Sequence, residues 1–265
     1  MPHLSPAARD DRGMRSPASF EQYAADGVLV LGGAAAILLQ IGDPVVARGV
    51  AEHSDFANRP MERLRNTLRY VYAVGLGSDD QSRWAARAVN RAHTGVTGAR
   101  DADRQLWVAA TLHRVGVSLH EQIVGPLPPA LADEIYSASE RLGSTLQVPP
   151  GVWPADRAAF ENYWADAVAG LEIGDDARGI ARDLLRNRAI PWWTRPAMPL
   201  VRVVTSGLLP ATVRDAYGLP WHPRRYRAAI GFVRMLRRAT PRRLRELPSR
   251  RLLAGLTEGQ SARIL

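Results

Sequence analysis

The chain of 265 residues contains no cysteine and no lysine. Without cysteine it can form no disulfide, thiolate-ligated haem, iron–sulfur cluster or cysteine zinc site. Any transition metal must therefore be held by histidine, carboxylate, tyrosine or methionine side chains. Because lysine is absent, all 35 basic side chains are arginines.

Most of the chain is close to neutral, and the formal net charge of +9 for the whole chain comes from one segment. Residues 224–251 contain eleven arginines and a single acid, Glu246, which gives this segment a net charge of +10. The remainder carries a net charge of −1. With 46% hydrophobic and 23% charged residues, the composition is typical of a soluble globular protein.

Alternating strand patterns, fixed-period repeats and membrane-length apolar runs are lacking as well. The apolar run Val28–Ile41 is too short to span a membrane. Its Gly32 and Gly33 favour close helix packing, since neither sits in a nucleotide-binding glycine pattern. The first eighteen residues have no apolar centre of the signal-peptide type, and we expect no targeting segment. These features predict a cytoplasmic protein, which could also be peripheral to a membrane.

Helical periodicity runs through most of the chain. We predict helices over Phe20–Gln40, Pro44–Ala51, Pro60–Val74, Asp79–Val96, Asp103–Val124, Pro128–Leu142, Ala155–Gly170, Asp176–Arg186 and Tyr226–Ala239. The fold class is therefore all-α, with a single multi-helix domain. We expect a flexible N-terminal arm over 1–18 and an α-helical domain over 19–225. An Arg-rich amphipathic helix and tail over 226–265 would be packed on that domain or appended to it.

The stretch Val89–Gly98 organises the other candidate residues. A capping box, Ser78-Asp79-Asp80-Gln81, marks the start of its helix, and apolar positions recur up to Val96. His93 falls on the edge of this apolar face, just before Gly95 and Gly98 let the chain turn away. An imidazole at this place is either a core-edge histidine satisfied by a hydrogen bond or a ligand of a bound group.

The helix predicted from Pro60 carries polar residues on two faces. Its solvated side consists of Glu62, Arg65 and Arg69. A further stripe, roughly 100° from the apolar one, consists of Arg63, Asn66, Thr67 and Tyr70. This combination of guanidinium, amide, hydroxyl and phenol could line a polar cavity beside the core. The alternative is a surface face whose polarity is incidental.

Three other histidines have weaker contexts. His113 and His120 share one stripe of the helix predicted over Asp103–Val124. They are about 10 Å apart along its axis, too far to bind one metal ion together. Either could face a cavity or a helix surface, and for His120 we expect the surface. His53 could line a pocket or hold a loop by hydrogen bonds.

Aromatic residues are frequent in the second half of the chain, at Trp192, Trp193, Tyr217 and Trp221. They could cover a hydrophobic ligand, with ordinary packing as the alternative. The helix predicted over Tyr226–Ala239 has an apolar side and an arginine side. Such a helix could lie on an anionic membrane surface or contact phosphates, or it could be a solvated face over the core.

Several short motifs occur along the chain in a fixed order. They are Gly32-Gly33, Leu38-Leu39-Gln40, Gly49-Val50, Glu52–Phe56, Arg63 with Thr67-Leu68, Gly77-Ser78, Asn90 with His93 and Gly98, Leu106-Trp107-Val108, Thr111-Leu112, Val124–Leu127 and Tyr217–Trp221. Together they resemble a family long catalogued as a domain of unknown function. It groups the rubber oxygenase called latex clearing protein with the MpaB-type oxygenase of mycophenolic acid biosynthesis. The resemblance covers about residues 20–225.

The resemblance implies one α-helical domain around a b-type haem held in a pocket between helices. His93 matches the axial histidine, and so the iron ligand, which agrees with a chain that lacks cysteine. Arg63 and Thr67 match the Arg-x-x-x-Thr of the pocket helix, where rubber oxygenases place a lysine before the threonine and this chain has Asn66. The candidate catalytic residues are thus Arg63, Asn66 and Thr67. The candidate cofactor-binding residues are His93, His53 and His113.

Three positions depart from the family pattern. Ala35 stands where an arginine is common, Asp43 where a histidine often precedes the proline, and Ala110 lies in a motif that often contains histidine. His113, one turn after Ala110, could replace that imidazole.

The first hypothesis is accordingly a haem-dependent oxygenase, an oxidoreductase that attacks a C=C bond of a small apolar or lipid-like substrate with O2. It could also need an electron donor. The alternative is a non-catalytic haem- or lipid-binding relative. A nucleic-acid-binding module is a third hypothesis, which rests on the arginine-rich segment alone.

Overall fold

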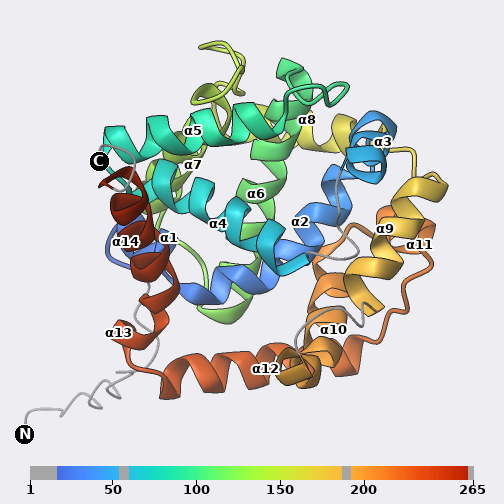
Figure 1. Ribbon diagram of the computed structural model, residues 1–265. Helices are drawn as coiled ribbons and strands as arrows, with labels where there is room; N and C mark the ends of the chain where they lie inside the picture. Colours follow the sequence, from blue (N-terminus) through green and yellow to red (C-terminus); the bar gives the residue numbers. More distant parts are fainter. Residues whose placement is uncertain (1–16, 54–59, 187–191, 262–265) are drawn as a thin grey trace, which may run out of the picture.

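The computed structural model describes residues 17–53, 60–186 and 192–261, and within these ranges the chain is helical and contains no strand. The predicted all-α fold class is confirmed (Figure 1). In chain order the elements are α1 (Phe20–Ala24), the 3-10 helix η1 (Gly27–Gly32), α2 (Gly33–Gln40), α3 (Pro44–His53), α4 (Pro60–Leu76), α5 (Asp79–Ala92), α6 (Ala102–Ile123), α7 (Pro129–Ser144), α8 (Arg157–Ala169), α9 (Asp175–Arg186), the 3-10 helix η2 (Trp192–Ala197), α10 (Met198–Leu208), α11 (Ala211–Ala216), α12 (Pro223–Ala239), α13 (Arg242–Arg245) and α14 (Leu247–Ser261).

Helix α6 passes through the middle of the molecule, with α2, α7 and η1 packed against it (Figure 1). It is apolar on two sides, as its sequence predicts, and it carries a large share of the core. The Trp107 indole donates a hydrogen bond of 3.1 Å to the Leu39 carbonyl and so ties α6 to the end of α2. A side chain at Gly32 would come within 2.6 Å of Val115 Cγ1, so glycine permits the close packing that its sequence context predicts.

The first predicted helix, Phe20–Gln40, is in fact three shorter elements. Asp26 interrupts it, because its side chain accepts a hydrogen bond of 3.2 Å from the Val28 amide and caps η1. A Cβ on Gly27 would lie 2.7 Å from the Arg245 carbonyl oxygen. The break therefore depends on a tertiary contact with the far end of the chain, which local periodicity does not contain.

The C-terminal segment is fixed to the N-terminal part of the chain. Arg237 and Arg245 both pair with the buried Asp26, at 2.9 and 2.5 Å. Helix α14, which the sequence analysis leaves as an undivided tail, packs on α4 and buries Leu256. Residues 1–16, most of the predicted N-terminal arm, lie outside the described residues.

In the described part of the chain, no helix by itself has the length and hydropathy needed to cross a membrane. One bent pair, Gly27–Gln40 with Pro44–Glu52 at an angle of 107°, meets the criteria jointly, by length and composition alone.

Candidate functional site

Helices α4 and α5 form an antiparallel pair that is packed at one end and divergent at the other (Figure 1). At the packed end, Tyr70 and Val74 of α4 share an apolar cluster with Ala85 and Val89 of α5. His93 lies one turn beyond this cluster on the α5 side. Asn66 and Thr67 lie about one turn before it on the α4 side. The topology therefore brings these residues, which are distant in sequence, to the same end of the pair.

His93 is the C-cap of α5, not a residue within the helix. The predicted helix to Val96 is wrong at its end, because α5 stops at Ala92. The His93 amide still donates to the Val89 carbonyl at 2.9 Å, and the chain then turns through Gly95 and Gly98 with φ of +82° and +72°. The predicted capping box at Ser78 is confirmed. The His93 side chain is partly buried, as its place on the edge of the apolar face predicts.

The turn that carries His93 is stabilised by hydrogen bonds among the side chains of Asn90, Gln105 and Gln147. The Gln147 side chain donates through Nε2 to Asn90 Oδ1 at 2.9 Å. The Gln147 backbone N–H donates to Gln105 Oε1 at 2.8 Å. Gln105 Nε2 in turn donates to the Ala99 carbonyl at 2.9 Å. This network joins the end of α5, the start of α6 and the segment after α7. Sequence analysis missed Gln105 and Gln147, because these residues meet Asn90 only through the fold.

A second set of contacts fixes the turn from its exposed side. An Arg100 guanidinium nitrogen donates to the Asn90 carbonyl and to Thr94 Oγ1, each at 3.1 Å. On the α3 side, a Cβ on Gly98 would lie 2.6 Å from Val45 Cγ1, so the turn lies directly against α3. His93 thus projects from a backbone that is fastened on several sides, which favours a ligand that is pre-positioned.

The α4 side of this end presents polar groups to solvent. Asn66 and Thr67 are exposed, whereas Tyr70, predicted on the same polar stripe, is buried and donates to the Leu142 carbonyl at 2.7 Å. Arg69, predicted to face solvent, is partly buried, and its pKa is lowered by burial and by the neighbouring Arg65.

The side chains of Arg63 and His53 lie outside the described residues, although α4 includes position 63 and α3 ends at position 53.

His113 occupies a different environment from His93. Its ring makes edge contacts with Tyr136, Trp153 and Phe160, and its Nδ1 lies 2.9 Å from Ser139 Oγ. These contacts come from α7, α8 and the segment between them rather than from α4 or α5. Burial, aided by two nearby arginines, lowers the pKa of His113 to about 4, so the imidazole is neutral at physiological pH.

The prediction that His120 lies at a helix surface is wrong. It is only 1% exposed, and neither ring nitrogen has a hydrogen-bond partner in the described part of the chain. The Tyr23 ring contacts it edge-on with a centroid distance of 5.3 Å. Burial, together with the nearby Arg237, lowers the pKa of His120 to about 4. The sequence pattern missed this because the surface that covers His120 comes from α1 and the C-terminal segment.

The aromatic residues of the second half that the structure describes have different surroundings. Trp192 is largely exposed, and the Tyr217 hydroxyl donates to the Leu38 carbonyl at 2.7 Å. Trp221 borders a separate pocket between α10 and the start of α12. The side chain of Trp193 lies outside the described residues.

Comparison with known proteins identifies related sequences. A family model described as "ER-bound oxygenase mpaB/B'/Rubber oxygenase, catalytic domain" matches residues 21–238. The uncharacterised proteins Mb2261 of Mycobacterium bovis and Rv2237 of Mycobacterium tuberculosis are each 35% identical to the chain over 227 residues. The match covers 79% of this chain and 89% of each relative. No solved structure matches the chain.

Proposed function

Since the chain belongs to the mpaB and rubber oxygenase catalytic-domain family, we propose that it is a b-type haem-dependent oxygenase that acts on a C=C bond of an apolar or lipid-like substrate. The observation that carries the proposal is the common location of His93, Asn66 and Thr67 at the divergent end of α4 and α5. The resemblance matches His93 to the axial histidine of the family and Thr67 to the Arg-x-x-x-Thr motif of the pocket helix.

The donor set at this end fits a macrocyclic cofactor. Among the residues that the structure describes, no group of three or more histidine and acidic side chains could hold a metal ion by itself. A porphyrin supplies its own ring nitrogens and requires only an axial ligand from the protein. His93 is partly accessible, whereas His113 and His120 are enclosed by packed side chains.

The bound haem would supply dioxygen activation, and the protein would set the geometry around it. His93 would hold the group through a turn that Asn90, Gln105 and Gln147 keep in place. The Thr67 hydroxyl and the Asn66 amide would offer hydrogen bonds to polar atoms at the reacting end of the substrate. Arg63 would add a positive charge on the same helix.

The assignment of His93 is tested by substitution. His93→Ala should lose haem at least about tenfold faster than the wild type in a transfer assay to apomyoglobin, because its axial bond is absent. His222→Ala removes an exposed histidine outside this end and should release haem at the wild-type rate. Retention of haem by His93→Ala, with the helical circular dichroism spectrum unchanged in both variants, would contradict the assignment.

A non-catalytic haem- or lipid-binding relative is favoured by a different observation. Ala35 and Ala110 are fully buried in the main apolar cluster, so these positions offer no polar group to a pocket. Asp43 is occupied as the cap of α3, where it accepts from the Val45 amide at 2.7 Å. Oxygen uptake that depends on an unsaturated substrate would support the oxygenase, and tight haem binding without such uptake would support the alternative.

We also propose peripheral contact of the C-terminal segment with anionic membranes. Phe232, Met235 and Leu236 of α12, and Leu244 of α13, are each at least half exposed. Exposed arginines such as Arg238 flank them. Apolar groups between cationic ones are the combination that inserts into a membrane interface.

A further inference from the structure

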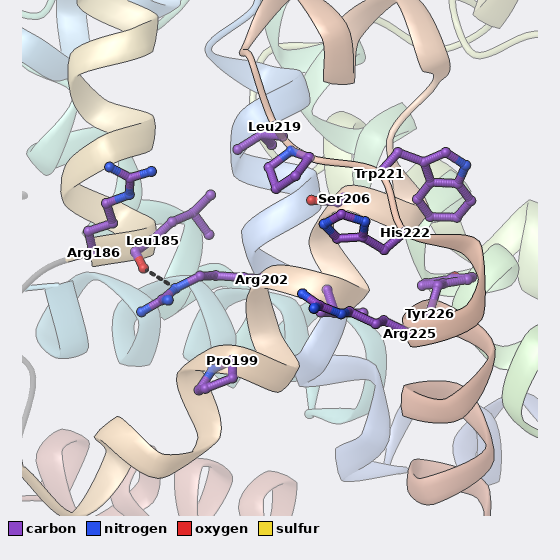
Figure 2. Close-up of a pocket in the computed structure, with 12 residues that line it drawn as sticks. Leu185, Arg186, Pro199, Arg202, Ser206, Leu219, Trp221, His222, Arg225 and Tyr226 are labelled. Atoms are coloured by element: carbon purple, nitrogen blue, oxygen red, sulfur yellow. Dashed lines mark hydrogen bonds between the residues drawn. The ribbon is translucent and has the colours of Figure 1, made fainter.

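A pocket of about 310 Å³ lies between the end of α9, α10, the 219–222 segment and the first turn of α12 (Figure 2). Its volume is at the lower end of the range for small-molecule sites. The proposed haem site contributes none of its lining residues. Its chemistry can therefore be considered independently of the oxygenase proposal.

The floor and walls of this pocket are apolar. Leu185, Val203 and Leu219 supply aliphatic surface, and Trp221 supplies an aromatic wall. Trp221 is held in place on two sides. The Arg214 guanidinium lies 4.7 Å from its ring centroid, and the Tyr226 ring packs against it at 5.3 Å. These contacts fix the Trp221 ring, which lowers the entropic cost of binding a ligand against it.

The pocket also carries positive charge. Arg186, Arg202 and Arg225 line it, and none of its lining residues in the described part of the chain is acidic (Figure 2). Arg202 donates through Nε to the Leu185 carbonyl at 2.9 Å, which leaves its terminal nitrogens for another acceptor. Within the described ranges, Arg186 and Arg225 have no ion-pair partner. Three guanidinium groups without a counterion in one pocket favour an anionic ligand.

Two further groups point to the same ligand chemistry. Helix α12 begins at the pocket, and its N-cap residue His222 makes no side-chain capping hydrogen bond. Pro223, the first residue of α12, has no amide proton, and the Tyr226 amide donates to the His222 carbonyl, so the amides of Arg224 and Arg225 are the ones available to an anion. Ser206, in contrast to the helical hydroxyls of Ser139 and Thr240, makes no hydrogen bond in the described chain although it is only 5% exposed. Figure 2 shows its oxygen beside His222, on the pocket side of α10.

We propose that this pocket binds a small single-chain amphiphile whose anionic head, a carboxylate or a phosphate monoester, lies between Arg202, Arg225 and the first turn of α12. The apolar chain lies against Val203, Leu219 and Trp221. Ser206 donates its hydroxyl to the head group, which gives this buried hydroxyl a hydrogen-bond partner, whereas the Tyr226 hydroxyl is already bonded to Gln122. A ligand with only one of the two parts would leave either the arginines without a counterion or the apolar walls in contact with water.

Isothermal titration calorimetry of the full chain separates the contribution of the anionic head from that of the apolar chain. Decanoate and decyl phosphate should bind with 1:1 stoichiometry, and decanol and inorganic phosphate should each bind at least about tenfold more weakly, the loss expected for a charge-assisted hydrogen bond or a buried chain. A difference between decanoate and decyl phosphate identifies the preferred head. Equal binding of decanol and decanoate would overturn the proposal.

Adjacent arginines provide a matched pair of variants. Arg225→Ala should weaken decanoate binding about tenfold, because Arg225 lines the pocket. Arg224→Ala removes the same charge from the neighbouring exposed position, which does not line it, and should change affinity less than twofold. Equal losses in both variants would mean general electrostatic attraction. Binding seen only with anionic vesicles, and unaffected by Arg225→Ala, would assign the ligand to a membrane surface. Either result contradicts the pocket.

Discussion

At the scale of single residues, two buried histidines make stability dependent on pH. His113 and His120 each have a pKa of about 4 in the folded chain, below the value of about 6.5 for an unfolded histidine. The unfolded chain therefore binds more protons between these two values. Each histidine contributes stability that is fully present above about pH 6.5 and is lost as the pH falls toward 4.

The His120→Leu variant tests this linkage. Its free energy of unfolding should fall less steeply between pH 6.5 and 4 than that of the wild type, by up to about 1.4 kcal/mol per pH unit, because one proton fewer is taken up on unfolding. Denaturant unfolding at several pH values measures the slope, which does not depend on whether the substitution changes stability overall. An unchanged slope would show that His120 titrates alike in both states.

At the scale of elements, the turn after α5 offers a pair of glycines with different surroundings. Gly95 and Gly98 both have positive φ, but a Cβ on Gly95 meets no atom within 4 Å, whereas one on Gly98 lies 2.6 Å from Val45 Cγ1. Gly95→Ala should cost about 1 kcal/mol from backbone strain alone. Gly98→Ala should cost more, about 2–3 kcal/mol, and should also weaken haem binding, because it displaces the turn that carries His93 from α3.

Denaturant unfolding of the two variants, and haem titration of each, measure both effects. If Gly98→Ala were no more destabilising than Gly95→Ala, the close contact between this turn and α3 would be incorrect.

For α5, local sequence signals predict the start of the helix better than its end. The capping box at Ser78 identifies the first residue of α5, since capping is a local interaction. The apolar spacing continues to Val96 although the helix stops at Ala92. The spacing of apolar residues does not predict the positive φ angles of Gly95 and Gly98, with which the chain turns away. Helix α10 is not among the predicted helices, because Pro199 lies in its first turn, where a proline is tolerated although it breaks a helix elsewhere.

The candidate site is predictable only in part for the same reason. His93, Asn66 and Thr67 are found from helical spacing and from the family motifs. The amide network that holds the turn is not, since Gln147 lies 57 positions from Asn90 in the sequence. The burial of His120 likewise depends on α1 and on residues near position 237.

At the scale of the whole molecule, the arginine-rich segment is partly structural. Arg237 and Arg245 pair with Asp26, while Arg242 and Arg250 bond to Glu246. Burial acts to raise the pKa of Glu246, but the bonds from these two arginines outweigh it and the pKa is lowered. Side chains engaged in this way are not available to phosphates, which weakens the inference of nucleic-acid binding from charge alone.

Removal of the buried Asp26 carboxylate should destabilise the attachment of the C-terminal segment to the N-terminal part of the chain. Asp26→Ala leaves Arg237 without its charge partner in a buried position and should lower the free energy of unfolding by about 3 kcal/mol or more. Asp133→Ala breaks a solvent-exposed pair with Arg157 and should cost less than about 1 kcal/mol. Similar losses in the two variants, measured by urea unfolding, would argue against a structural clamp at Asp26.

Membrane contact would be a property of the outer surface formed by α12 and α13. The double variant Phe232→Ser with Met235→Ser should reduce sedimentation with vesicles that contain anionic lipid by at least about tenfold, because each apolar side chain contributes through burial in the interface. Val152→Ser, at another exposed apolar position, serves as the control. Binding that survives the double variant would place the contact elsewhere or in charge alone.

The central claim, a haem held by His93, is tested most directly by an absorption spectrum. The purified chain, expressed with added haem precursor, should show a Soret band at near one haem per chain, and reduction with dithionite should shift that band to a ferrous spectrum. Absence of a Soret band, even after reconstitution of folded protein with haemin, would contradict a haem-dependent oxygenase.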